Sequence, residues 1–182
     1  MRIVAGFKKG KVLMSPTDDK TRPTSDKARK ALFDILSSKL LKADKSWQDI
    51  TFLDVFAGTG AIGIEALSRG VKESYFIENH PPALACLKSN AKDFTNAHIL
   101  MSNACLPPFT EKAVNVVFMD APYREELWEK ALTALYNKGW IDRDTLIVVE
   151  IEHSEESILP SGFIKIDDRV YGRNRLLFVK KE

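Results

Sequence analysis

Apolar and polar residues alternate along this chain in a regular strand and helix order. Short apolar runs predict strands at 51–56, 73–78, 97–101, 114–119 and 145–151. Between them, apolar residues at helical spacing predict helices at 61–69, 81–93 and 125–137. Because parallel strands are joined by helical crossovers, this order predicts an α/β fold with a mainly parallel, doubly wound sheet.

The first part of the chain breaks this pattern. Residues 2–14 predict a β-hairpin around a basic turn with two glycines. Thr24 or Ser25 can cap a helix that continues to about Leu41. We therefore expect residues 1–46 to form a basic hairpin and helix extension of the domain.

The end of the chain predicts a β pair at 162–168 and 173–180, which would add an antiparallel edge to the sheet. The length of 182 residues and the hydrophobic content of 45% predict one globular domain over residues 1–182. No apolar run is long enough to span a membrane. Two cysteines without a close partner disfavour a disulfide framework and fit a reducing cytoplasm.

Charge is unevenly distributed along the chain. The first thirty residues carry nine basic and three acidic side chains, a net charge of +6, whereas the other 152 residues have a net charge of −4. A basic arm on a slightly acidic body is typical of a protein that binds a polyanion. We expect RNA phosphates to contact Lys8, Lys9, Lys11 and Arg22.

A glycine-rich loop follows the apolar run that begins at Phe52. The spacing of its glycines lets the backbone turn tightly and approach a nucleotide-like cofactor, and an acidic residue about twenty positions later can hold ribose hydroxyls. A carboxylate beside the loop suits a sulfonium and an ammonium better than a pyrophosphate, which favours S-adenosylmethionine over a dinucleotide. After the third predicted strand, an amide and a backbone N–H could read the adenine edge. The expected cofactor contacts are Asp54, Phe56, Gly58, Gly60, Glu78, Asn79, Asn103 and Ala104.

A second motif, Asp120-Ala121-Pro122-Tyr123, follows another apolar run. An exocyclic amine on a base is a poor nucleophile because its lone pair is delocalised, and a carboxylate with a backbone carbonyl can localise that pair. Tyr123 can stack on the base. Methylation of a pyrimidine carbon would need a cysteine nucleophile, and this loop has none. The expected catalytic residues are Asp120, Pro122 and Tyr123, and the scattered histidines predict no metal site.

With both loops placed, the chain resembles the RsmD family, the bacterial small-subunit ribosomal RNA guanine-N2 methyltransferases. The likeness covers nearly the whole length. It rests on Arg2-Ile3-Val4-Ala5-Gly6, Arg22-Pro23-Thr24-Ser25-Asp26, Asp54-Val55-Phe56-Ala57-Gly58-Thr59-Gly60 and Glu65-Ala66-Leu67-Ser68-Arg69-Gly70. The chain departs from the family pattern Asp-Pro-Pro-aromatic at Ala121, which keeps the acceptor carbonyl but loses the restraint that proline places on φ.

The resemblance implies a Rossmann-like class I methyltransferase with a seven-stranded sheet, an antiparallel edge strand and an N-terminal β-hairpin and helix. It implies S-adenosylmethionine as methyl donor and a guanine N2 amine in small-subunit rRNA as acceptor, within an assembling or assembled subunit. Four alternatives stay open: methylation of adenine N6, methylation of a protein glutamine, a nicotinamide-dependent oxidoreductase and a non-catalytic ribosome assembly factor.

Overall fold

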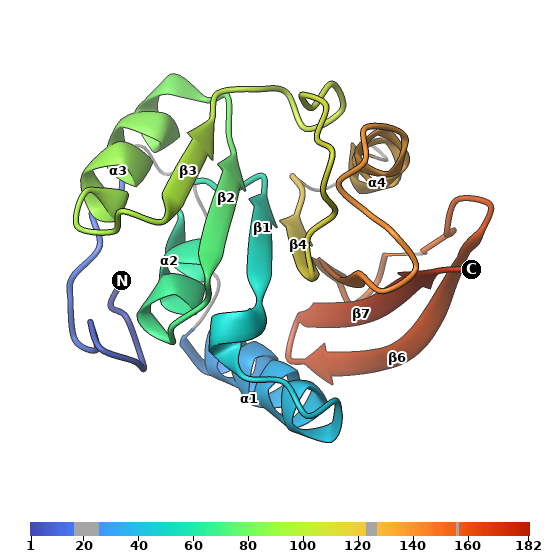
Figure 1. Ribbon diagram of the computed structural model, residues 1–182, viewed down its shortest axis with the longest axis horizontal. Helices are drawn as coiled ribbons and strands as arrows, with labels where there is room; N and C mark the ends of the chain where they lie inside the picture. Colours follow the sequence, from blue (N-terminus) through green and yellow to red (C-terminus); the bar gives the residue numbers. More distant parts are fainter. Residues whose placement is uncertain (17–25, 123–126, 156) are drawn as a thin grey trace.

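The computed structural model describes residues 1–16, 26–122, 127–155 and 157–182, and the strands among them form one seven-stranded sheet (Figure 1). The order of the strands across the sheet is β3-β2-β1-β4-β5-β7-β6. The strands are β1 (Thr51–Val55), β2 (Glu73–Ile77), β3 (Ala97–Leu100), β4 (Val116–Asp120), β5 (Leu146–Glu152), β6 (Phe163–Tyr171) and β7 (Asn174–Lys181).

Strands β1 to β5 are paired in parallel, whereas β7 is antiparallel to both β5 and β6. The predicted doubly wound sheet with an antiparallel pair at the end of the chain is therefore confirmed. Because β7 is inserted between β5 and β6, β6 runs in the same direction as the parallel strands. The turn that follows β6 consequently lies at the edge of the sheet where the parallel strands end.

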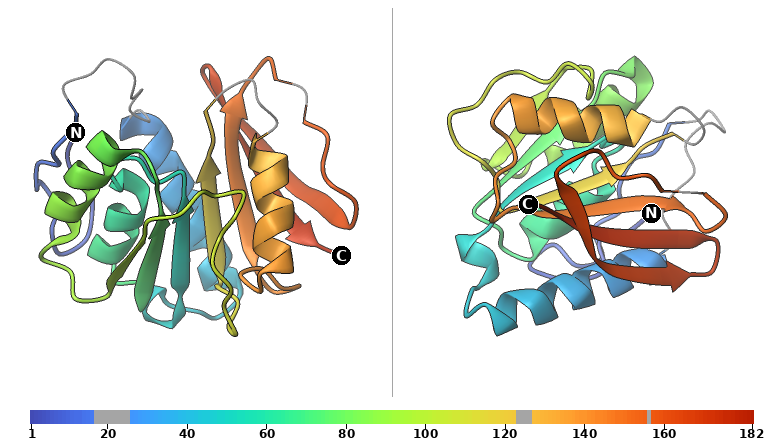
Figure 2. Two further views of the ribbon diagram at one scale, coloured as in Figure 1. Left: turned by 90° about the horizontal axis from the view of Figure 1, so that it is seen from above. Right: turned by 90° about the vertical axis from the view of Figure 1, so that its right-hand side faces the viewer.

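Helices cover both faces of the sheet (Figure 2). The helices are α1 (Asp26–Lys42), the short 3-10 helix η1 (Trp47–Asp49), α2 (Ala61–Ser68), α3 (Pro81–Ala91) and α4 (Leu127–Asn137). Apolar residues of α1, α2 and α3 join one buried cluster, and those of α4 join the other. The predicted helices are confirmed to within a few residues where the structure describes them.

The central strand β4 shows why the predicted strands are nearly continuous apolar runs. Val116 and Phe118 belong to the cluster that faces α1 and α2, whereas Val117 and Met119 belong to the cluster that faces α4. All four side chains are at most 2% exposed. A strand that is covered on both faces has no solvent side and therefore needs no polar alternation.

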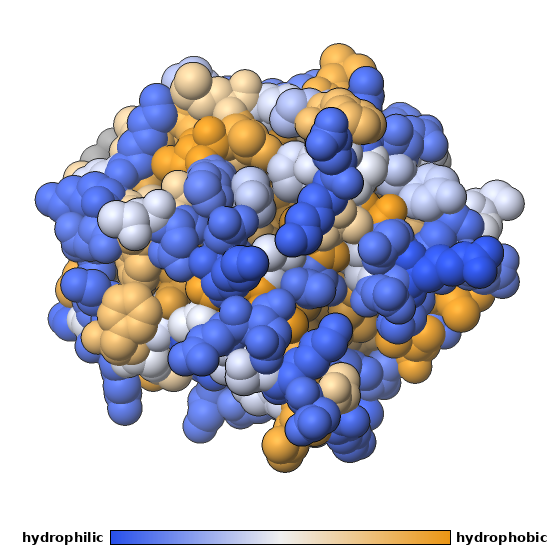
Figure 3. All heavy atoms as spheres, in the orientation of Figure 1, coloured by the Kyte–Doolittle hydropathy of each residue, from blue (hydrophilic) through white to orange (hydrophobic). Residues whose placement is uncertain are grey.

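The surface is largely polar, with apolar side chains scattered among charged ones (Figure 3). The outermost strand β6 exposes Ile164, Ile166 and Val170 by 41–50%. In the part of the chain that the structure describes, no helix is both long and apolar enough to cross a membrane.

The predicted β-hairpin at residues 2–14 was wrong in its detail. Its two arms share only one antiparallel bridge, between Arg2 and Val12. The reason is that the backbone N–H groups of Val4 and Ala5 donate to the carboxylate of Glu65 on α2 instead of to a second arm, at 2.8 and 3.0 Å. The predicted helix caps, Thr24 and Ser25, lie outside the described residues.

Candidate active site at the carboxyl ends of the strands

Four acidic residues stand in a row at the carboxyl edge of the sheet, one at the end of each of four neighbouring strands. The residues are Glu78 after β2, Asp54 on β1, Asp120 on β4 and Glu150 on β5. The strand registers pair Asp54 with Phe118, and Asp120 with Glu150. Since side chains two residues apart share a face, the row lies on the face that α1 and α2 cover. We call these four residues the acidic row.

Asp54 is the most deeply placed member of the row, with 2% of its surface exposed. Its Oδ2 accepts a hydrogen bond of 2.8 Å from the backbone N–H of Gly63, near the start of α2. Burial raises the pKa of Asp54 well above its usual range, and the charges of Asp120 and Glu78 raise it further. A cation that entered the site would therefore relieve an electrostatic cost that the protein already bears.

The three glycines of the loop after β1 serve different purposes. Gly58 adopts a φ of +56° with open space where a side chain would begin. A Cβ at Gly60 would lie 2.3 Å from Cδ1 of Leu87, and one at Gly63 would lie 2.3 Å from the ring of Phe76. Gly58 therefore leaves room for a ligand, whereas the other two allow α2 to pack closely on its neighbours.

Glu78 holds the glycine loop in place. Its Oε2 accepts a hydrogen bond of 2.7 Å from the N–H of Gly58, and its Oε1 accepts from the N–H groups of Asn79 and His80 at 2.8 and 2.7 Å. The sequence interpretation gave Glu78 a role toward ribose hydroxyls and missed this role toward the backbone. A carboxylate has about four acceptor positions, so three backbone donors leave one for a ligand hydroxyl.

Two further predicted cofactor contacts lie beside this loop. Phe56 takes a positive φ of +59°, which is uncommon for a residue other than glycine and marks the sharp turn away from β1. Asn103 is exposed, and its Oδ1 accepts a hydrogen bond of 2.8 Å from the N–H of Cys105. Ala104 is 4% exposed and packs in the cluster under α4. The reading of an adenine edge by Asn103 and Ala104 stays a prediction.

The acceptor loop begins where β4 ends. Asp120 is half-buried, Ala121 is 7% exposed and Pro122 is exposed. Asp120 thus sits between the buried row and the surface, where a large substrate could reach it. Tyr123 lies outside the described residues, so its predicted stacking on a base stays a prediction.

Glu150 is the member of the row to which the sequence interpretation gave no role. It is 3% exposed, and the side-chain amide of Asn174 at the start of β7 donates to its Oε1. Burial raises the pKa of Glu150 to about 8, and the neighbouring charge of Asp120 contributes in the same direction. The signal that could have revealed it is an acidic residue at the end of an apolar strand, as at Asp54 and Asp120.

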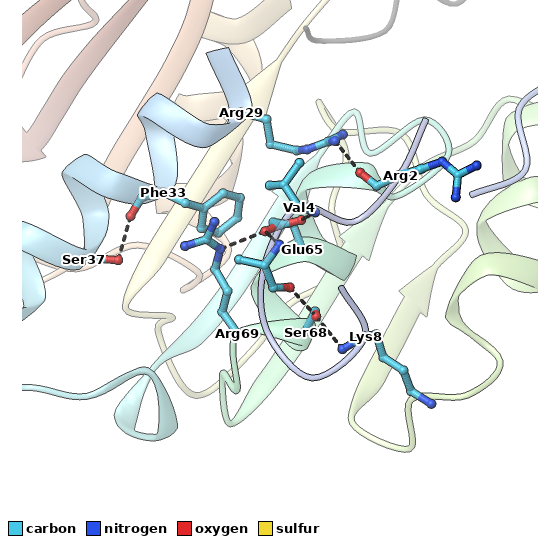
Figure 4. Close-up of polar contacts among 10 residues, drawn as sticks. Arg2, Val4, Lys8, Arg29, Phe33, Ser37, Glu65, Ser68 and Arg69 are labelled. Atoms are coloured by element: carbon cyan, nitrogen blue, oxygen red, sulfur yellow. Dashed lines mark hydrogen bonds and ion pairs between the residues drawn. The ribbon is translucent and has the colours of Figure 1, made fainter. Parts of the chain in front are cut away.

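The N-terminal segment docks against the side of α2 (Figure 4). Glu65 is fully buried there and accepts from the N–H groups of Val4 and Ala5 and from Nε of Arg69, at 2.8 to 3.0 Å. Each carboxylate oxygen thus binds a backbone donor of the N-terminal segment. The sequence interpretation quoted Glu65 only as part of a family motif.

The basic turn, which we define as residues 6–10, is fixed to the far end of α2. Oγ of Ser68 accepts from the N–H of Lys8 at 3.0 Å, and a Cβ at Gly6 would lie only 1.8 Å from the carbonyl oxygen of Ser68. α2 begins at the glycine loop and returns along the sheet, so Ser68 lies toward the amino ends of the strands. The basic turn and the acidic row are therefore at opposite ends of α2.

The predicted RNA-binding residues differ in what they already contact. Lys9 is exposed, and Lys8 is half-buried. Lys11 instead forms an ion pair with Asp93 at 2.7 Å and also donates to the carbonyl of Asn90. Arg22 lies outside the described residues. Of the predicted set, Lys8 and Lys9 are therefore the better described candidates for a phosphate contact, because the ammonium group of Lys11 is already engaged.

Together these groups form an anionic, partly buried edge with a glycine loop beside it and an accessible carboxylate at Asp120. The arrangement can bind a cation near the loop and accept hydrogen bonds from an amine. Within the described residues, no group of three or more His, Cys, Asp or Glu is arranged to hold a metal ion.

Comparison with known proteins gives consistent matches over almost the whole chain. The family model described as Conserved hypothetical protein 95 matches residues 1–180. An Escherichia coli relative named Ribosomal RNA small subunit methyltransferase D is 35% identical over 156 residues, which cover 84% of this chain and 75% of the relative. A relative of the same name from Buchnera aphidicola is 32% identical over 165 residues, which cover 88% of this chain and 83% of the relative.

Solved structures agree with these matches. The Escherichia coli protein yhhF superposes with a TM-score of 0.83 at 32% identity and covers 100% of this chain and 98% of its own. A more distant structure, described as a mutant of MtNAS in complex with S-adenosylmethionine, has a TM-score of 0.63 at 12% identity and covers 86% of this chain and 67% of its own. At that identity the likeness shows the fold alone.

Proposed function

We propose a function from the premise that this chain belongs to the family described as Conserved hypothetical protein 95, the RsmD family, and is a methyltransferase with a Rossmann-like fold. We infer that it transfers a methyl group from S-adenosylmethionine to the N2 amine of one guanine in small-subunit rRNA. The names of the relatives support ribosomal RNA as the class of substrate. Small-subunit particles, assembling or assembled, would then be its partners.

The acidic row beside the glycine loop is the observation that carries this proposal. S-adenosylmethionine brings a sulfonium and an ammonium, which a row of carboxyl groups attracts. The pyrophosphate of a dinucleotide would be repelled by the same groups, which argues against a nicotinamide-dependent oxidoreductase. Asp54 lies next to the loop, and Glu78 keeps one acceptor position for a ribose hydroxyl. Phe56, Gly58, Gly60 and Asn79 would line the rest of the cofactor path.

The acceptor loop would supply the chemistry. The carboxylate of Asp120 and the carbonyl of Ala121 accept the two N–H groups of the guanine amine and turn its lone pair toward the methyl group. The N–C bond forms as the S–C bond breaks, and the electron pair of the broken bond stays on sulfur, which gives S-adenosylhomocysteine. The amine nitrogen then releases one proton. Tyr123 would hold the base flat, and Pro122 would shape the loop.

The basic turn would bind phosphates of the same RNA. Lys9 is exposed and Lys8 is half-buried, and the turn that carries them is fixed by the contacts of Gly6 and Ser68. A fixed turn loses little conformational freedom when it binds, which favours recognition of a folded RNA surface. We expect this contact to weaken as salt increases.

The decisive experiment is single-turnover methyl transfer to small ribosomal subunits that lack the modification. Asp120→Ala should lower the rate by roughly a hundred- to thousandfold, because it removes one preorganised partner of the transition state. Asp144→Ala, an exposed carboxylate at the opposite edge of the sheet, is the matched control and should keep the normal rate.

Two results would contradict the proposal. A normal rate for Asp120→Ala, with S-adenosylmethionine binding intact, would place the reaction elsewhere. Mass spectrometry that located the methyl group on adenine N6 or on a protein glutamine would replace the guanine acceptor.

A further inference from the structure

Glu150 and Asp120 occupy equivalent positions on adjacent parallel strands. Their Cα atoms are register partners at the ends of β5 and β4. In-register side chains on neighbouring strands share a face, and the strands lie about 4.8 Å apart. Glu150 is 3% exposed, whereas Asp120 is half-buried and reaches toward the acceptor loop. The two carboxyl groups are therefore close neighbours, one inside the protein and one at the substrate side.

Asn174 fixes the buried member of this pair. It begins β7, directly after the turn that follows β6, and its amide donates to Oε1 of Glu150. Its register partner is Glu152, so its side chain reaches diagonally along the strand to Glu150. Since an amide cannot be ionised, it holds one oxygen of Glu150 in place at any pH.

We propose that Glu150 is a positioning residue for Asp120: as a carboxylic acid it donates a hydrogen bond to the Asp120 carboxylate and holds that carboxylate toward the target amine, while Asn174 holds Glu150. This inference rests on the proposed function, in which Asp120 accepts the amine N–H groups.

The electrostatics of the site support a protonated Glu150. Burial raises the pKa of Glu150 to about 8, and Asp120 raises it as well, whereas the hydrogen bond from Asn174 lowers it. Two carboxyl groups at this separation do not both ionise easily, so the buried one retains the proton at neutral pH. One acid and one carboxylate can form a strong, charge-assisted hydrogen bond.

Other titratable groups near Glu150 do not replace this pairing. Among the described residues, those on the elements packed around it are Asp120 and Asp54 on β4 and β1, Glu152 on β5, Tyr171 on β6 and Arg29 on α1. Arg29 donates to the carbonyl of Arg2 at 2.6 Å. Arg175 on β7 pairs with Asp168, and its register partner Ile151 belongs to the cluster under α4, on the opposite face.

The proposal predicts how methyl transfer responds to pH. In the wild type, kcat should fall as pH rises through about 8, because Glu150 loses the donated proton. Glu150→Gln should keep a rate near that of the wild type at pH 7 and should lose this alkaline fall, since its amide donates at every pH. Glu150→Leu should lower kcat ten- to a hundredfold, the cost of one hydrogen bond to a charged group, with KM for S-adenosylmethionine within twofold.

The pair can also be tested without methyl transfer, which separates it from the proposed function. Carboxyl 13C NMR of the whole protein should show Glu150 titrating near pH 8, and Asp120→Asn should lower that midpoint. If it does so while no RNA is methylated, the proposed function fails and the carboxyl pair stands. An unchanged midpoint would overturn the pair.

Two kinetic results would also overturn the positioning role. A wild-type rate that rises through pH 8 and is lost in Glu150→Gln would make Glu150 a base. A normal rate in a folded Glu150→Leu would leave it without a role. If Glu150→Leu does not fold, Glu150→Gln, which matches glutamate in shape, still decides between these outcomes through its pH profile.

Discussion

Replacing Glu150 with glutamine should make the protein more stable at alkaline pH. The pKa of Glu150 is about 8 in the folded protein, against 4.5 for an ordinary glutamate. Between these values the folded state holds a proton that the unfolded chain has released, so the free energy of unfolding falls as pH rises from about 4.5 to 8. At about 1.36 kcal/mol per pKa unit, the loss amounts to at most about 5 kcal/mol above pH 8. Glutamine carries no such proton and should avoid this loss.

The assay is denaturant unfolding of the wild type and of Glu150→Gln at pH 5 and pH 8.5. The stability of the variant relative to the wild type should increase by several kcal/mol between the two pH values, equivalent to about 10–20 °C in Tm for a chain of this size. Glu152→Gln removes a half-buried carboxylate from the same strand end and serves as the control. If both variants behave alike, or if the gain of Glu150→Gln is the same at both pH values, then Glu150 does not retain its proton in the folded state.

Further predictions concern packing, docking and charge. Gly63→Ala should lower the free energy of unfolding by about 1–3 kcal/mol, because the added Cβ would lie 2.3 Å from the Phe76 ring; an unchanged denaturation midpoint would refute this close packing. Glu65→Ala should abolish hydrogen-exchange protection of the two backbone N–H groups that it binds, and retained protection would show another acceptor. Replacing Lys8 and Lys9 with alanine should reduce the salt dependence of RNA binding by a slope of roughly 0.7–0.9 per phosphate contact, measured by filter binding, without changing S-adenosylmethionine affinity; an unchanged slope would mean that the turn does not contact RNA.

The order and type of the central elements could be predicted from the sequence because they depend on local patterns. The run 114–119 has the composition of a strand buried on both faces, and β4 is such a strand. Helical spacing at Trp128 and Leu132 indicated core packing, and both residues are at most 3% exposed. The position of β7 between β5 and β6 has no local signal, because it depends on which strand edge the last hairpin pairs with.

The candidate site shows the same limit. The glycine loop and the two acidic strand ends at Asp54 and Asp120 could be found from motif and spacing. The role of Glu78 toward three backbone N–H groups could not, because it depends on how the loop folds back over β2. The pairing of Glu150 with Asn174 joins residues 24 positions apart through the antiparallel register, which no motif reveals.

The docking of the N-terminal residues on α2 sets a minimum footprint on the nucleic acid. α2 separates the glycine loop from the basic turn, and its eight residues rise about 12 Å along the helix axis. An RNA whose target base enters the site must continue for at least that length, about four stacked nucleotides at 3.4 Å each, before its phosphates reach Lys9. Oligonucleotides shorter than this footprint should be poor substrates even when they contain the correct base. A folded particle, whose phosphates lie at fixed distances from the target, can span both ends of the ruler at once.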